Sequence, residues 1–117
     1  KDTFEEVVTN NDFVIVDFWA PWCGPCRSFA PTYEKVSEDH ADVVFAKVNT
    51  EEERELAGHF QIRSIPTLMI FRDKIIIFSE AGALPESAFR ELVNKAGELD
   101  MDEVRRQVAE QQQSSQA

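Results

Sequence analysis

The sequence predicts an α/β fold in which helices cover both faces of a central mixed β-sheet. Two apolar runs of strand length, residues 13–19 and 43–48, are separated by a helical pattern over residues 27–39, and strands joined through a helix run parallel with a right-handed crossover. Two further apolar runs, residues 68–71 and 75–78, are separated by a turn of three residues, which suits an antiparallel hairpin. A chain of 117 residues allows one domain with a sizeable core.

Four helices are predicted around these strands, because apolar residues recur there every three or four positions. The first ends before Asn10, the second spans residues 27–39, the third runs from Thr50 through Phe60, and the fourth spans residues 85–95. Thr50 and Glu53 have the spacing of a capping box for the third helix. Gly97 is expected to end the fourth.

The last stretch, residues 98–117, predicts a short additional helix and then a disordered polar tail. Asp100 and Glu103 have the spacing of another capping box, and the tail from Gln111 onward is of low complexity. The helix carries an apolar stripe of Met101, Val104 and Val108. This stripe would dock either on its own domain or on a partner.

Acidic residues outnumber basic residues by 22 to 12, which gives a formal net charge of −10. Such a charge disfavours nucleic acid and anionic membranes as partners. No apolar run approaches the roughly 18 residues of a membrane span, and no signal peptide is visible in the chain, which starts at Lys1. Two cysteines, and no others, fit a reducing compartment better than an oxidising one. We therefore expect a cytoplasmic protein that acts as a monomer.

The two cysteines, Cys23 and Cys26, stand three positions apart at the predicted entrance of a helix. Residues at this spacing share a helix face, and a modest adjustment brings their sulfur atoms into bonding geometry. The loop so closed is too short to stabilise the fold much, which indicates redox chemistry. Because a helix N-terminus favours a thiolate, we predict Cys23 as the exposed nucleophile and Cys26 as the more buried resolving thiol.

Two other interpretations of this cysteine pair stay open. One is a purely structural disulfide, as in small secreted proteins. The other is half of a zinc site, which needs four ligands and would have to use His40 and His59, although neither histidine stands in a zinc-binding pattern. We expect no metal at this site.

Asp17 interrupts the apolar run that leads to the cysteines. A carboxylate in a buried strand is unfavourable unless it is paired or functional. It is either a solvated acid at the strand end or an acid beneath the cysteines. In the second case desolvation would raise its pKa and make it a proton acceptor for Cys26.

Over residues 1–97 the chain resembles thioredoxin, and two motifs carry the resemblance. They are Val16-Asp17-Phe18-Trp19-Ala20-Pro21-Trp22-Cys23-Gly24-Pro25-Cys26 and Arg63-Ser64-Ile65-Pro66-Thr67. The resemblance implies the thioredoxin fold over residues 1–97, with the family's first strand missing from the start of this chain. The helical extension over residues 98–117 goes beyond a minimal thioredoxin. The hairpin turn Arg72-Asp73-Lys74 departs from the family because it lacks the usual glycine.

The resemblance also implies site roles. Asp17 falls on the family's buried acid and Lys47 on the lysine that neighbours it. Pro66 falls on a cis-proline that faces the disulfide, which would present the Ile65 backbone to a substrate strand. The substrate would contact the residues around the sulfur atoms, namely Trp22, Gly24, Pro25, Ile65, Pro66, Gly82 and Ala83.

The function implied by the resemblance is that of a protein disulfide reductase, active in electron transport and redox homeostasis. It would bind no cofactor itself and would receive electrons from NADPH through a flavin-containing thioredoxin reductase, its partner besides the disulfide-containing substrate proteins. Gly24 and Pro25 between the cysteines resemble reductases, because oxidases and isomerases of the superfamily more often carry a histidine there. Two alternatives remain: an extracytoplasmic oxidase or isomerase, and a thioredoxin-fold binding or chaperone module whose C-terminal helix recruits a partner.

Overall fold

The computed structural model describes residues 2–116, and the side chains of residues 3–112. Its sheet has the strand order β2-β1-β3-β4, and β1 lies parallel to β2 and antiparallel to β3, which in turn pairs antiparallel with β4. The strands are β1 (Phe13–Trp19), β2 (Val44–Asn49), β3 (Thr67–Arg72) and β4 (Ile75–Ala81). The predicted mixed sheet, with a parallel pair followed by a hairpin, is confirmed.

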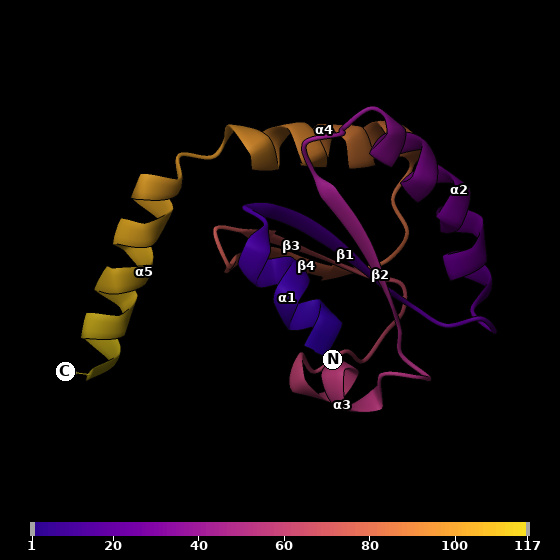
Figure 1. The fold of residues 1–117 in the computed structure, drawn as a ribbon, viewed down its shortest axis with the longest axis horizontal. Coiled ribbons are helices and arrows are strands. Elements are labelled where there is room, and N and C mark those ends of the chain that lie inside the picture. The colour runs from indigo at the N-terminus through magenta and orange to yellow at the C-terminus, as the bar shows by residue number, and fades with distance from the viewer. Residues whose placement is uncertain (1, 117) are drawn as a thin grey trace.

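Helices cover both faces of this sheet, as predicted, and a fifth helix stands apart at the C-terminal end (Figure 1). They are α1 (Asp2–Asn10), α2 (Gly24–Glu38), α3 (Arg54–His59), α4 (Glu86–Glu98) and α5 (Met101–Gln116). None of the described helices is long and apolar enough to cross a membrane.

Strand β1 sends alternate side chains to the two faces of the sheet. On one face Val14, Val16 and Phe18 pack with apolar residues of α1 and α3. On the other face Ile15 packs with apolar residues of α2 and α4. Asp17 follows Ile15 at a spacing of two, so the carboxylate lies on the face covered by α2, the helix that contains Cys26.

Two predicted helix boundaries, the start of α3 and the end of α4, are wrong. Helix α3 begins at Arg54, and its N-cap residue Glu53 makes no side-chain cap bond. Thr50 does not cap it, because the Thr50 hydroxyl donates instead to the Trp19 carbonyl at 3.1 Å. Gly97 lies inside α4, which ends at Glu98. A Cβ atom at Gly97 would lie 3.4 Å from the Phe13 ring, an ordinary contact distance, so this part of α4 packs against the start of β1.

The β3–β4 turn closes without glycine. Asp73 and Lys74 both adopt the left-handed region, with φ of 51° and 70°, which suits the right-handed twist of a two-residue hairpin. The Asp73 backbone N–H also donates to the Asp12 carbonyl at 2.8 Å. The departure from the family pattern is therefore accommodated by unfavourable backbone angles at two residues and not by a longer turn.

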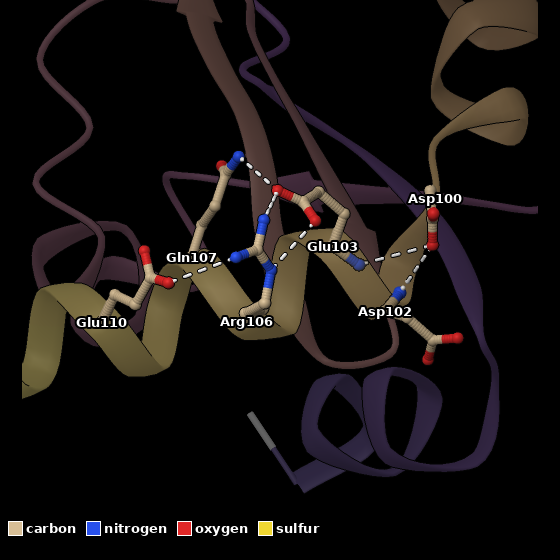
Figure 2. A network of polar contacts seen from close by, with 6 residues as sticks. All are labelled: Asp100, Asp102, Glu103, Arg106, Gln107 and Glu110. Carbon is tan, nitrogen blue, oxygen red and sulfur yellow. Dashed lines mark hydrogen bonds and ion pairs between the residues drawn. The ribbon is translucent and has the colours of Figure 1, made fainter.

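Helix α5 begins at the predicted cap. The Asp100 carboxylate accepts the backbone N–H groups of Asp102 and Glu103 at 3.1 and 3.3 Å (Figure 2). The Glu103 side chain does not complete a capping box, because it pairs with Arg106 and Gln107 one turn further on. The helix continues to Gln116, so the disordered tail predicted from Gln111 is helical over its described residues, and Ala117 lies outside them.

The first turns of α5 contact the rest of the chain. Met101 is buried, and the Arg105 guanidinium lies 2.5 Å from the Asp73 carboxylate in the β3–β4 turn. Val104 and Val108 of the predicted stripe are only half-buried. The stripe therefore docks on its own domain at its N-terminal end, and the helix extends away beyond it (Figure 1).

Candidate functional site

Cys23 and Cys26 lie where β1 gives way to α2. Cys23 is the N-cap residue of α2, and its Sγ accepts a hydrogen bond from the Cys26 backbone N–H at 3.2 Å. The two residues form a disulfide with a Cα–Cα distance of 5.2 Å, within the usual range. Pro25 occupies an early helical position, where its missing N–H leaves no hydrogen bond unmade. The structure thus pairs the cysteines at a helix N-terminus, as the sequence predicts.

Cys26 is buried as predicted, whereas the predicted exposure of Cys23 is wrong for this oxidised form. Cys23 is 5% exposed and Cys26 is 3% exposed, because both pack with Ala20, Trp19 and Ile65. Their surroundings nevertheless differ. The Cys23 sulfur receives a backbone N–H and lies at the positive end of the α2 dipole, and both features stabilise a thiolate.

Asp17 is completely buried, at 0% exposure, so the interpretation as a solvated strand-end acid is wrong. Neither of its carboxylate oxygens has a hydrogen-bond partner among the described residues. Burial raises the pKa of Asp17 from its ordinary value of 3.8 to about 6, and the charge of Lys47 opposes that rise. A carboxyl group with this pKa can both take up and release a proton near neutral pH.

Lys47 stands beside Asp17 in the sheet. The two residues are register partners in the parallel β1–β2 pair, so the ammonium group comes from the strand next to that of the acid. Lys47 itself is exposed, and its Nζ lies 5.1 Å from the centre of the Trp19 ring. A cation over an aromatic face is held in place by the ring, which keeps the charge on the Asp17 side of β2.

The loop before β3 faces the cysteines. Its Ile65–Pro66 peptide bond is cis, as the resemblance implies, and the Ile65 carbonyl oxygen lies 3.7 Å from the Cys23 Sγ. The Gly82 backbone N–H donates to the Pro66 carbonyl at 2.8 Å, and Gly82 has a φ of 116° that favours glycine. The fold therefore brings Ile65, Pro66 and Gly82 together beside Cys23.

Trp22 is the most exposed of the large apolar side chains, at 65%. Its indole Nε1 donates to the Glu51 carboxylate, 29 positions further along the chain, and Arg54 pairs with the same carboxylate at 3.6 Å. The indole is thus oriented from the turn before α3. Sequence reasoning missed Glu51, because the acidic run around it has the pattern of a helix start.

The other predicted substrate-contact residues, Gly24, Pro25 and Ala83, are exposed. In the described part of the chain no group of three or more His, Cys, Asp or Glu side chains is placed to hold a metal ion. The arrangement therefore consists of a redox-active sulfur pair, a buried acid with its lysine, and a backbone edge at Ile65 next to the sulfur.

Comparisons with known proteins agree with this geometry. The family model described as "Thioredoxin" matches residues 1–95. A "Putative thioredoxin 2" of Streptomyces coelicolor is 55% identical over 112 residues, which cover 96% of this chain and 84% of the relative. "Thioredoxin 1" of Synechococcus elongatus is 44% identical over 92 residues, 78% of this chain and 86% of the relative. The solution structure of oxidised thioredoxin from Plasmodium falciparum superposes with a TM-score of 0.75 at 35% identity, covering 82% of this chain and 91% of the other.

Proposed function

This chain belongs to the thioredoxin family, and we propose that it reduces protein disulfides with Cys23 as the attacking thiol and Cys26 as the resolving thiol. Family membership makes it a thiol–disulfide oxidoreductase, and the Cys23–Cys26 disulfide is the oxidised state of its redox pair. One observation supports the assignment of Cys23 as the thiol that attacks first. The sulfur that accepts the helix N–H and lies 3.7 Å from the Ile65 carbonyl belongs to Cys23.

In the first step the Cys23 thiolate attacks one sulfur of a substrate disulfide. A mixed disulfide forms, and the other substrate sulfur leaves as a thiolate. The substrate chain lies extended against the Ile65 backbone, where main-chain hydrogen bonds recognise it without regard to its side chains. Pro66 is buried and Ile65 is half-buried, whereas Trp22 and Gly82 are exposed. The exposed residues would give the substrate a shallow contact surface, which suits protein substrates.

In the second step Cys26 gives its proton to Asp17, directly or through a water molecule, and attacks the Cys23 sulfur. The mixed disulfide breaks, the second substrate sulfur leaves, and two electrons have passed from the protein to the substrate. The pKa of about 6 that burial gives Asp17 makes it a base of suitable strength near neutral pH. Lys47 limits the rise of this pKa and so keeps a useful fraction of Asp17 ionised.

The oxidised protein must then be reduced again. We propose that the electrons come from NADPH through a flavin-containing thioredoxin reductase, and that the protein works as a monomer in a reducing compartment such as the cytoplasm. The Gly-Pro pair between the cysteines supports the reducing direction. Disulfide-containing proteins are the substrates.

The reduction potential of Cys23–Cys26 tests this proposal. Equilibration of the protein against glutathione buffers should give a potential of about −270 mV, the figure known for thioredoxins. A potential of about −120 to −180 mV, as in oxidants and isomerases, would reverse the direction of electron flow. A variant with both cysteines changed to serine should lose all activity towards insulin disulfides, and a biological activity that survived in it would favour the binding module.

We also propose that residues 98–117 are an addition to a catalytic domain over residues 1–97. The family match ends at residue 95, whereas the Streptomyces relative matches 96% of the chain and so shares most of α5. Helix α5 is tied to the domain by the buried Met101 and by the ion pair of Arg105 with Asp73 in the β3–β4 turn. A chain ending at Leu99 should keep its rate of insulin reduction, and a large loss of that rate would make α5 part of the catalytic unit.

A further inference from the structure

Tyr33 is a buried side chain to which the proposed reaction gives no role. It projects from α2 onto the sheet and is 2% exposed. Its hydroxyl lies 2.9 Å from the Ile15 carbonyl oxygen on β1 and 2.6 Å from the Ala46 carbonyl oxygen on β2. A phenol has a single proton, so one hydroxyl serves two acceptors on neighbouring strands.

The position of this hydroxyl along the strands is informative. On the face covered by α2, the β1–β2 register pairs Ile15 with Phe45 and then Asp17 with Lys47. The two carbonyls that Tyr33 contacts belong to Ile15 and to Ala46, the residue just before Lys47. The hydroxyl therefore bridges the strands between these two pairs, next to the buried acid and its lysine.

We propose that Tyr33 is a positioning residue for the proton-transfer pair: its hydroxyl holds β1 and β2 in alignment and so sets the placement of Lys47 relative to Asp17. The proposal deepens the proposed function, since it rests on Asp17 as the proton acceptor for Cys26. The aromatic ring is fixed independently of the hydroxyl. It packs with the rings of Phe29, Phe45 and Phe89, at centroid distances of 5.8, 5.4 and 5.7 Å.

The groups that face Asp17 from the neighbouring elements are few. Lys47 comes from β2 and is the charge that lowers the pKa of Asp17, while on β3 its register partner is the apolar Leu68. Helix α2, which covers this face, buries Cys26 and the Tyr33 phenol, and burial, together with the Asp17 charge, raises the pKa of Tyr33 well above 10. Tyr33 is therefore neutral at working pH and acts by alignment, whereas Lys47 acts by charge.

The variant Tyr33→Phe removes the hydroxyl and keeps the ring. If β2 is no longer held against β1 at this point, Lys47 stabilises the Asp17 carboxylate less, and the carboxyl should titrate at a pH higher by about 0.5 or more. The measurement is the ¹³C carboxyl shift of Asp17 against pH in the oxidised full-length protein, with Asp17→Asn to assign the signal. The pH dependence of the resolving step should move by the same amount.

Val36→Ala is the matched control. Val36 is buried on the same face of α2 and belongs to the same core cluster, so its truncation destabilises this core and leaves the hydroxyl in place. We expect the control to lose stability without any change in the Asp17 titration. An Asp17 titration that is unchanged in Tyr33→Phe, or that moves equally in Val36→Ala, would overturn the proposal.

A second measurement keeps the Tyr33 hydroxyl in place. Tyr33 is the only tyrosine of the chain, so biosynthetic 3-fluorotyrosine labels this position alone. Its ¹⁹F signal should move with a midpoint near the Asp17 pKa of about 6, and the movement should vanish in Asp17→Asn. A signal that is flat across this range would overturn the coupling between Tyr33 and Asp17.

The two proposals fail in different ways. If Asp17→Asn resolves mixed disulfides at the parental rate, Asp17 is not the proton acceptor, and a shifted titration in Tyr33→Phe would still establish the positioning contact. If Asp17→Asn is slow while Tyr33→Phe leaves the titration unchanged, the proton acceptor stands and the role of Tyr33 is refuted.

Discussion

Replacing Asp17 by asparagine should raise the stability of the oxidised protein relative to the parent as the pH rises from about 4 to 7, by an amount that the pKa of Asp17 defines. The folded-state pKa of about 6 lies about 2 pH units above the ordinary value of 3.8, and each unit is worth about 1.4 kcal/mol. Below about pH 3.8 the carboxyl is protonated in both states and carries no penalty. Between about pH 4 and 6 the unfolded chain releases its proton first, so the stability of the parent falls. Above that range ionisation costs the folded protein about 3 kcal/mol.

The assay is urea unfolding of parent and Asp17→Asn proteins from pH 3.5 to 8, without reductant. The buried amide leaves donors unpaired and adds a penalty of about 1–3 kcal/mol, but this penalty is independent of pH. The stability difference between the two proteins should therefore rise by about 3 kcal/mol across the range and level off near pH 7. Asp42→Asn, at an exposed position, controls for the loss of one negative charge. A difference that stays flat with pH would refute the reasoning.

Three further predictions address the thiol order, the indole contact and the hairpin turn. Cys26→Ser should accumulate mixed disulfides with substrate proteins on non-reducing gels and Cys23→Ser should not; equal trapping by both would contradict the assigned order. Glu51→Ala frees the Trp22 indole and should lower kcat/KM for a protein disulfide about three- to tenfold, because one hydrogen bond is lost. The control Glu51→Gln keeps an acceptor and should lose less. Equal kcat/KM in the alanine variant and the parent would show that this contact plays no part in substrate recognition. Lys74→Gly removes the steric cost of a left-handed backbone at φ 70°. This gain exceeds the cost of the added flexibility in the unfolded chain, so the free energy of unfolding should rise by about 0.5–1 kcal/mol. A lower free energy of unfolding in urea would count against that backbone conformation.

Sequence patterns that are complete within a few residues predicted the structure well. The apolar runs predicted the strands, and the spacing of Cys23 and Cys26 predicted their bond. The errors arose where the same residue types serve a distant partner. Thr50 has the spacing of a cap, yet its hydroxyl bonds a carbonyl 31 positions earlier. Gly97 has the position of a helix end, yet α4 continues past it to Glu98 and packs beside Phe13 there.

Electron transfer and proton transfer at the site also differ in whether they depend on local or on distant contacts. Electron transfer uses two sulfur atoms three positions apart in the chain, so their spacing is enough to locate it. In the proposed mechanism the proton passes to Asp17, whose pKa is raised by burial and lowered by Lys47 on the neighbouring strand. Tyr33 joins those strands through carbonyls 18 and 13 positions away. Because no local pattern encodes contacts between these elements, substitutions that tune the proton step should lie on the elements that enclose Asp17, namely α2 and the α2-facing side of β1 and β2.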